Sequence, residues 1–72
     1  MVRLGSIETT TGHTVELDYS GGRFRSVLME DGAPVSDLDL DGPSAEDFYA
    51  VLEGAGAIDA PFPCHFARRS ER

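Results

Sequence analysis

The sequence predicts an α+β fold, in which a four-stranded antiparallel β-meander is followed by one C-terminal α-helix packed on the sheet. Two observations predict it. Four short segments of strand composition are separated by turns that contain glycine, and the last strand is followed by a stretch with helical apolar period. Strands joined by tight turns pair as antiparallel neighbours, so the helix is left to cover one face of the sheet.

The length of the chain limits it to one domain. Its 72 residues are expected to form a single domain over residues 1–60, with a proline-containing and partly disordered tail over 61–72. A domain of this size buries only about 60% of the surface of its unfolded chain. Small scaffolds therefore often rely on disulfides, metals or a partner subunit. Cys64 is the only cysteine, so no intramolecular disulfide can form.

The charge balance is strongly acidic, with 13 Asp and Glu against six Arg and a net charge of -7. This composition argues against nucleic acid as a partner and favours solubility, cationic partners or metals. The first residues are too few and too polar for a signal peptide, and no run approaches the roughly 20 apolar residues of a membrane helix. We therefore expect a cytoplasmic protein without a membrane partner.

The first two strands are expected over residues 3–10 and 13–19. In the first, Leu4 and Ile7 are out of phase for a period of two, and Gly5 between them indicates a β-bulge that restores the phase. In the second, apolar and polar residues alternate, so one face is buried and the other faces water. The buried set is Val15, Leu17 and Tyr19, and the wet set is Thr14, Glu16 and Asp18.

The third strand, residues 23–30, has apolar residues on both of its faces. Phe24 and Leu28 share one face, and Val27 and Met29 share the other. A strand that is apolar on both faces is covered on both faces. The helix can cover one of them, while the C-terminal tail or a second copy of the chain covers the other. We expect a homodimer with Val27 and Met29 at its interface.

The fourth strand follows a turn at Asp31-Gly32, a pair that suits positive φ at both central positions. We expect this strand over residues 35–40, with Leu38 and Leu40 directed inward. Gly42-Pro43 then ends it, because proline cannot continue the ladder of hydrogen bonds.

The helix is expected to begin at an N-cap on Ser44, with Asp47 as its capping-box partner. Glu46 and Asp47 would lie in the first turn, where the helix dipole favours acids. Either Gly54 or Gly56 supplies the left-handed residue at the C-terminus. The expected apolar stripe is Phe48, Val51, Leu52 and Ala55.

Two prolines, Pro61 and Pro63, exclude further regular structure after the helix. The aromatic residues of this segment, Phe62 and Phe66, are expected to dock on the sheet.

An acidic stretch offers the first candidate for chemistry. Asp37-x-Asp39-x-Asp41-Gly42 matches the first half of a calcium-binding EF-hand loop. The match ends at its twelfth position, where Phe48 replaces the bidentate glutamate. In the simpler interpretation, Asp37 and Asp39 lie on the solvent face of an edge strand, where charges discourage pairing with other chains.

A second candidate combines Cys64 and His65 with the distant His13. These three do not have the ligand number or spacing of a zinc site. A nucleophilic cysteine would also need a base held within hydrogen-bond reach. We therefore interpret Cys64 as an incidental thiol and expect no cofactor.

The order of four strands followed by a helix with an acidic N-terminus is similar to that of the single-strand-binding transcriptional coactivator family. That resemblance implies a dimer that binds DNA through a basic, aromatic-bearing sheet. Here the third strand carries only Arg23 and Arg25, and the sheet is otherwise rich in acids. Nucleic-acid binding through these arginines is thus the third choice.

The sequence contains no nucleophile–base pair, no catalytic carboxylate pair and no glycine-rich phosphate loop, so we expect a non-enzymatic protein. The preferred hypothesis is a small acidic protein-binding or regulatory module, a homodimer, that presents an acidic edge to a partner. The alternative is a calcium-type domain that binds through Asp37, Asp39 and Asp41. The residues of the acidic edge are Asp37, Asp39, Asp41, Glu46 and Asp47.

Overall fold

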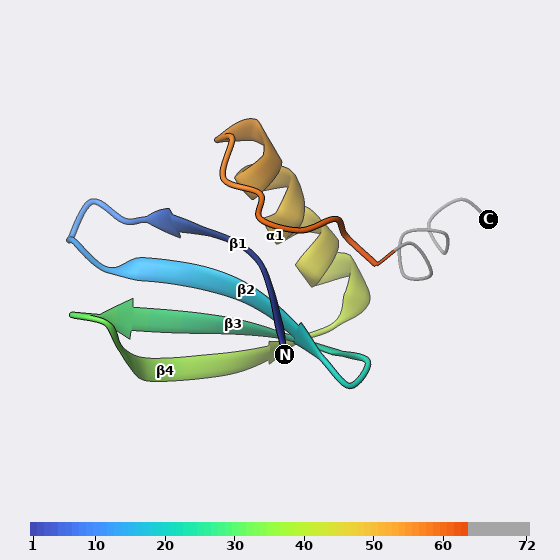
Figure 1. Ribbon diagram of the computed structural model, residues 1–72, viewed down its shortest axis with the longest axis horizontal. Helices are drawn as coiled ribbons and strands as arrows, with labels where there is room; N and C mark the ends of the chain where they lie inside the picture. The colour runs from blue at the N-terminus through green and yellow to red at the C-terminus, as the bar shows by residue number, and fades with distance from the viewer. Residues whose placement is uncertain (64–72) are drawn as a thin grey trace.

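The computed structural model describes residues 1–63 and confirms the α+β meander (Figure 1). Its strands form one sheet in the order β1-β2-β3-β4, with every neighbouring pair antiparallel and helix α1 on one face. The elements are β1 Val2–Glu8, β2 Thr14–Ser20, β3 Arg23–Glu30, β4 Ala33–Leu40 and α1 Gly42–Gly54. Within the described residues, no helix has the length and apolar character needed to cross a membrane.

The turn between β3 and β4 has the predicted conformation. Asp31 and Gly32 have φ values of 53° and 80°, and Asp31 is the only residue other than glycine with positive φ in the part of the chain that is described. Positive φ at both central positions matches the right-handed twist of the paired strands. The turn therefore sets the first pairs of β3 with β4, Glu30 with Ala33 and Met29 with Pro34, beyond which a bulge shifts the register by one residue.

The predicted bulge lies in β1. Arg3 pairs with Asp18 and Gly5 pairs with Leu17, so Leu4 is the extra residue on its strand. The bulge turns Leu4 toward the helix, where only 1% of its surface remains exposed. Leu4 and Ile7 thereby both reach the core, although residues three positions apart in a regular strand would lie on opposite faces.

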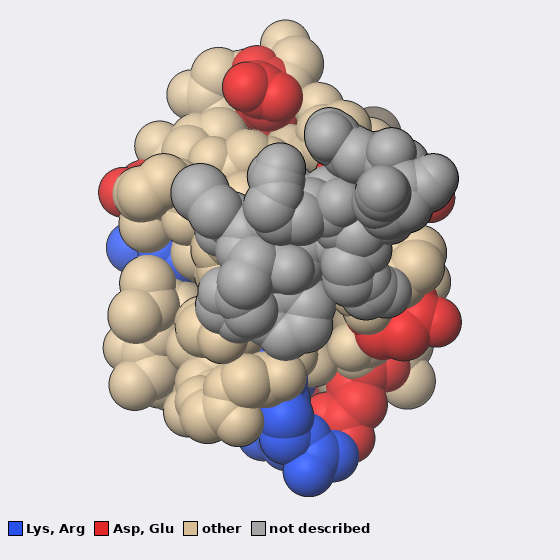
Figure 2. All heavy atoms as spheres, turned by 90° about the vertical axis from the view of Figure 1, so that its right-hand side faces the viewer, with Lys and Arg blue, Asp and Glu red and all other residues tan. Residues whose placement is uncertain are grey.

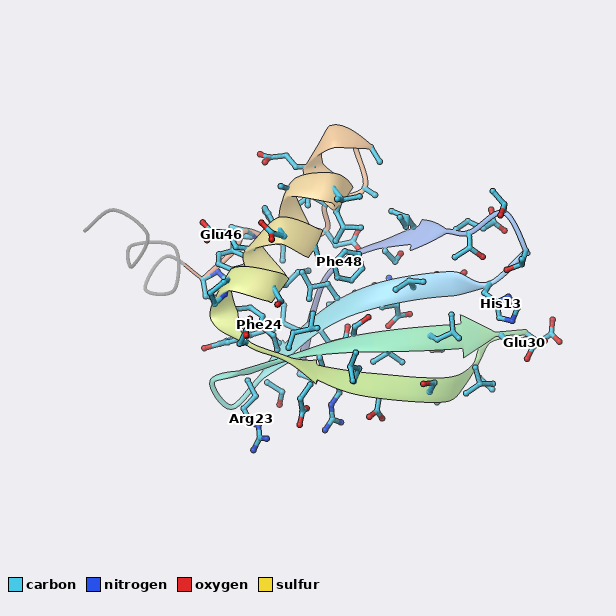
Figure 3. All side chains as sticks on the ribbon, turned by 180° about the vertical axis from the view of Figure 1, so that it is seen from behind. His13, Arg23, Phe24, Glu30, Glu46 and Phe48 are labelled. Atoms are coloured by element: carbon cyan, nitrogen blue, oxygen red, sulfur yellow. The ribbon has the colours of Figure 1, made fainter. Side chains whose placement is uncertain are left out.

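The core lies between α1 and the sheet. Phe24 is its centre: its ring lies 4.9 Å from that of Tyr19 and stacks at 5.2 Å on that of Phe62. In Figure 3, Phe24 and Phe48 both lie in the layer between helix and sheet. The docking of Phe62 is thus confirmed, whereas Phe66 lies outside the described residues. The buried cluster is Leu4, Leu17, Phe24, Ala45 and Leu52.

The predicted N-cap at Ser44 is wrong, because Asp41 caps the helix. Its side chain accepts a hydrogen bond of 2.8 Å from the Ser44 N–H, and α1 begins directly after it at Gly42. Pro43 is tolerated in the first turn because its missing N–H has no partner there in any case. The earlier start also leaves the first turn without an acid, so Glu46 and Asp47 lie beyond it.

The buried face of α1 also differs from the predicted stripe. Leu52 is buried and Phe48 packs against the core, as expected. Val51, however, is 57% exposed, and Ala55 lies at the exposed C-cap. The residues that face the sheet are Ala45, Phe48, Tyr49 and Leu52.

The helix ends in a Schellman motif centred on Gly56, whose φ is 70°. The Gly56 N–H donates to the Glu53 carbonyl at 3.1 Å, and the Ala57 N–H donates to the Leu52 carbonyl at 2.9 Å. Of the two predicted C-terminal glycines, Gly56 is therefore the left-handed one. The motif turns the chain back toward β1.

The segment 57–60 then runs along the outer edge of β1. The Ser6 N–H donates to the Ala57 carbonyl at 3.3 Å, and the Asp59 N–H donates to the Leu4 carbonyl at 2.7 Å. Gly5 forms an isolated antiparallel bridge with Ile58. This edge of the sheet is therefore covered, although the segment is too short to count as a fifth strand.

Candidate functional site

The sheet face opposite α1, which we call the open face, carries a cross-strand row of alternating charge. The strand register places Arg3, Asp18, Arg25 and Asp39 side by side on β1, β2, β3 and β4. Arg23 also points away from the helix (Figure 3). Every arginine in residues 1–63 thus lies on the open face, although the chain as a whole is acidic.

Ion pairs engage all three arginines of this face. Arg23 Nη2 and Arg25 Nε both contact the carboxylate of Asp39, at 3.3 and 3.6 Å. Arg3 contacts Glu16 at 3.4 Å and Asp59 at 3.2 Å. Figure 2 shows basic and acidic side chains adjoining at the lower rim of the molecule. Because the arginine side chains are at least half exposed, such pairs contribute little to stability.

Asp18 is the buried member of the row, with only 4% of its surface exposed. Its Oδ1 has no hydrogen-bond partner among the described residues. Burial raises the pKa of the Asp18 carboxyl, and the nearby charge of Glu16 raises it further, while Arg3, Arg25 and the N-terminal ammonium group of Met1 lower it. The sequence predicted that Asp18 faces water, and this prediction is wrong.

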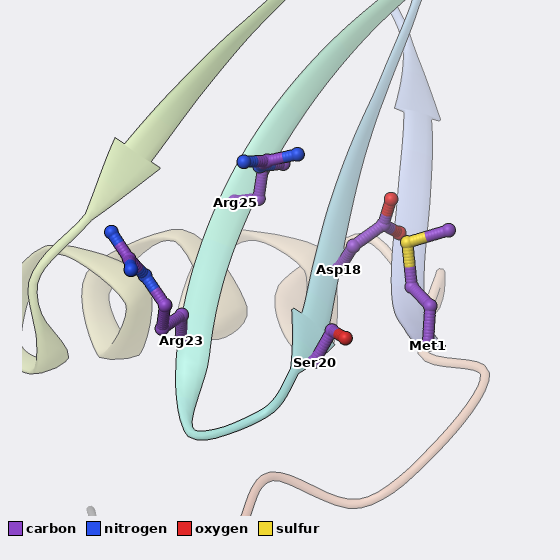
Figure 4. A pocket seen from close by; sticks show the side chains of 5 residues that line it. All are labelled: Met1, Asp18, Ser20, Arg23 and Arg25. Atoms are coloured by element: carbon purple, nitrogen blue, oxygen red, sulfur yellow. The ribbon is translucent and has the colours of Figure 1, made fainter.

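Two hollows adjoin Asp18 on the open face. The first has a volume of about 320 Å³ and is lined by Met1, Asp18, Ser20, Arg23 and Arg25 (Figure 4). The second, of about 270 Å³, shares Met1, Asp18 and Arg25 with the first. It continues over Val27, Met29 and Pro34 toward Glu16 and Asp37. The buried carboxylate therefore lies where a polar hollow meets a more apolar one.

The predicted dimer residues Val27 and Met29 lie on the open face, as their alternation required. Val27 is only 9% exposed and Met29 is partly buried, so together they offer a small apolar surface. Their contact with a second copy stays a prediction.

The five acids of the predicted edge are divided among three places. Asp37 and Asp39 lie on the open face of β4, and Asp39 already pairs with two arginines. Asp41 is used as the N-cap, and Glu46 and Asp47 belong to α1. Within residues 1–63, no group of three or more His, Cys, Asp or Glu side chains could hold a metal ion. The calcium-type alternative therefore rests on sequence spacing alone.

His13 lies at the end of the sheet that holds the β1–β2 turn and the last residues of β3. Its Nε2 is 3.7 Å from Glu30 Oε2, and its Nδ1 is 2.9 Å from Thr11 Oγ1 (Figure 3). These contacts join the β1–β2 turn to the end of β3. Cys64 and His65 lie outside the described residues.

The helix side of the sheet leaves an apolar strip outside the core. Val15 and Leu28 are cross-strand partners on this side, yet neither belongs to the core cluster or packs against it. Leu38, two positions before the partly buried Leu40, is 64% exposed. The prediction that Leu38 points into the core is wrong, because α1 packs over β1, β2 and β3. We call Val15, Leu28 and Leu38 the helix-side strip.

Sequence reasoning missed Asp18 as a site residue. Aspartate is depleted in strands, so its place within a clean strand was one available signal. The glycine turn after β2 was a second, since it sets the register that puts Asp18 opposite Arg25. Burial of the carboxylate could not be seen from the alternating pattern.

In comparisons with known proteins, no family model, curated protein or solved structure matches this chain.

Proposed function

We propose that this protein is a small acidic, non-enzymatic protein-binding module that engages its partner through the helix-side strip. The exposure of Leu38 carries this proposal. A leucine that is 64% exposed on the side of the sheet that holds the core leaves apolar surface for a partner to bury. The neighbouring Val15 and Leu28 extend that surface across two further strands.

The charges on this side specify the partner. Within residues 1–63, the helix side carries acids from α1 and the β3 end but no arginine. These acids are Glu30, Glu46, Asp47 and Glu53. A complementary surface combines apolar side chains with Lys or Arg, because opposite charges steer association and like charges oppose it. The partner is therefore a basic, amphipathic protein segment.

The same reasoning assigns self-association to the other face. Two copies brought together by their helix sides would place acids against acids. The open face carries both signs in its row from Arg3 to Asp39, so that row can complement its own copy. Val27 and Met29 supply the apolar centre of such a homodimer.

Site-specific photo-crosslinking in the source cells tests the proposal. A photo-reactive amino acid in place of Leu38 should yield a discrete protein adduct whose crosslinked peptide is rich in Lys, Arg and apolar residues. The same amino acid in place of the exposed Ser20, on the opposite face, should not yield that adduct. An adduct at residue 20 alone, or an acidic crosslinked peptide at residue 38, would contradict it.

Charge reversal then locates the acids that matter. The double variant Glu46→Lys/Asp47→Lys should lose the adduct, and Asp37→Lys on the open face should keep it. If Asp37→Lys abolishes the adduct and the helix variant retains it, the binding site is instead the acidic edge of β4.

A further inference from the structure

We propose that the two hollows beside Asp18 form a binding site for a zwitterionic α-amino acid with an apolar side chain. This site lies on the open face, where it shares Val27 and Met29 with the proposed homodimer interface, and it is separate from the helix-side strip. The ligand's ammonium group would meet Asp18, its carboxylate would meet Arg25, and its side chain would lie over Val27 and Met29.

The buried carboxylate supplies the first half of the argument. A buried polar atom that lacks a partner is costly to stability, so native proteins keep few of them. Asp18 Oδ1 is such an atom, and its residue lines both hollows. Because a carboxylate only accepts hydrogen bonds, the missing partner is a donor, and an ammonium group is the strongest donor of suitable size.

The two guanidinium groups supply the second half. Arg23 and Arg25 share one carboxylate, that of Asp39, so most of their N–H donors are not used by it. Both residues line the first hollow, together with the Ser20 hydroxyl group. Arg25 is the cross-strand partner of Asp18, and residues paired in this way have Cα atoms only about 4.5–5.5 Å apart. One small ligand can thus reach both the Asp18 carboxylate and the Arg25 guanidinium group, whereas the Arg23 side chain is directed toward β4 (Figure 4).

The mixed charge of the site selects a zwitterion over a simple ion. A bare cation at Asp18 would meet the repulsion of Arg23 and Arg25 in the same hollow. A bare anion at the arginines would meet the buried charge of Asp18, which Glu16 reinforces. A ligand that carries both charges on neighbouring atoms satisfies each group and leaves the net charge unchanged.

The second hollow accounts for an apolar side chain. It adjoins the first at Met1, Asp18 and Arg25, and most of its lining surface is apolar. Val27 is nearly buried beneath it. The two volumes, about 320 and 270 Å³, lie near the lower end of the range for small-molecule sites. An amino acid such as leucine matches these volumes, with its charged groups in the first hollow and its apolar side chain in the second.

Calorimetry with the full chain tests the proposal, with L-leucine as the probe. Isocaproate keeps the carboxylate and the carbon chain but lacks the ammonium group, and isoamylamine lacks the carboxylate. Leucine should bind at least tenfold more tightly than either, because each lost charge-assisted contact is worth about 1.5–3 kcal/mol.

Asp18→Asn should weaken leucine binding at least tenfold and leave the weak binding of isocaproate unchanged or stronger. Glu8→Gln removes one exposed acid from the end of β1, outside both hollows, and should bind leucine as the unmodified protein does. Far-ultraviolet circular dichroism checks that each variant is folded. The proposal is overturned if leucine produces no heat at tens of millimolar, if isocaproate binds as tightly, or if Asp18→Asn leaves leucine binding intact.

Discussion

A Cβ atom on Gly5 would lie only 2.5 Å from the carbonyl oxygen of Ala57, so these two residues define how closely the chain after the helix approaches β1. The obstructing atom belongs to the backbone, and the Leu52 side chain is 3.0 Å from the same position. The backbone oxygen cannot yield without moving segment 57–60 away from β1.

Gly5→Ala should therefore destabilise the protein by about 1–3 kcal/mol, the usual cost of overpacking a core. Urea unfolding followed by circular dichroism measures the change. Gly54→Ala is the matched control: nothing lies within 4 Å of its Cβ position, and alanine is favoured over glycine in a helix by about 1 kcal/mol. Equal stability of Gly5→Ala and the parent would show that segment 57–60 does not dock on β1.

The helix cap gives a second prediction. Asp41→Ala should cost about 0.5–2 kcal/mol, since it removes the acceptor for the Ser44 N–H. Ser44→Ala should change stability by no more than about 0.5 kcal/mol, because that side chain is exposed and is not the cap. The opposite order of effects in thermal melts would return the cap to Ser44.

The buried Asp18 predicts an unusual dependence of stability on pH. Its pKa is raised in the folded state, so the folded protein holds the proton more tightly than the unfolded chain, whose value is near 3.8. Stability from this group is present below that value and is lost as the pH rises through the folded pKa. The Asp18→Asn variant has no ionisable group at this position, so its stability does not show this loss as the pH rises.

The Asp18→Asn variant should accordingly melt at a higher temperature than the parent at neutral pH, and the difference should close near pH 3.8 and below. Melting temperatures recorded across that pH range test this. A gap that is constant with pH, or of the opposite sign, contradicts the raised pKa.

The two faces also predict distinct effects on oligomeric state. Met29→Glu should convert a dimer into a monomer of 7.8 kDa in light scattering, because it places charge at the apolar centre of the open face. Leu38→Glu should leave the dimer intact. Loss of the dimer on Leu38→Glu alone would move the interface to the helix side. Leucine should also favour the monomer, since it competes for Met29.

Much of the sheet could be predicted from the sequence because its signals are local. Asp31-Gly32 specifies a turn by its own backbone preferences, and the period of two on β2 specifies which residues share a face. The start of α1 was mistaken because Gly42-Pro43 suits both a turn and a first helical turn. Only the side-chain contact from Asp41 distinguishes the two.

The exposure of Leu38 and the burial of Asp18, by contrast, could not be predicted from local signals. Each residue lies on the face that alternation assigned to it, yet its exposure is the opposite of what that face implied. Both depend on which strands the helix covers and on which side chains surround the site. Those are properties of the assembled layers, so no local pattern contains them.

The segment that returns along β1 has a consequence for assembly. Its hydrogen bonds to Ser6 and Leu4 occupy one margin of the sheet, which leaves β4, within the described residues, as the margin open to another strand. A sheet can continue to grow from molecule to molecule only if each molecule has two free edge strands. A molecule with one free edge strand can pair with a single neighbour, so growth by strand addition stops at a pair and cannot extend into a fibre.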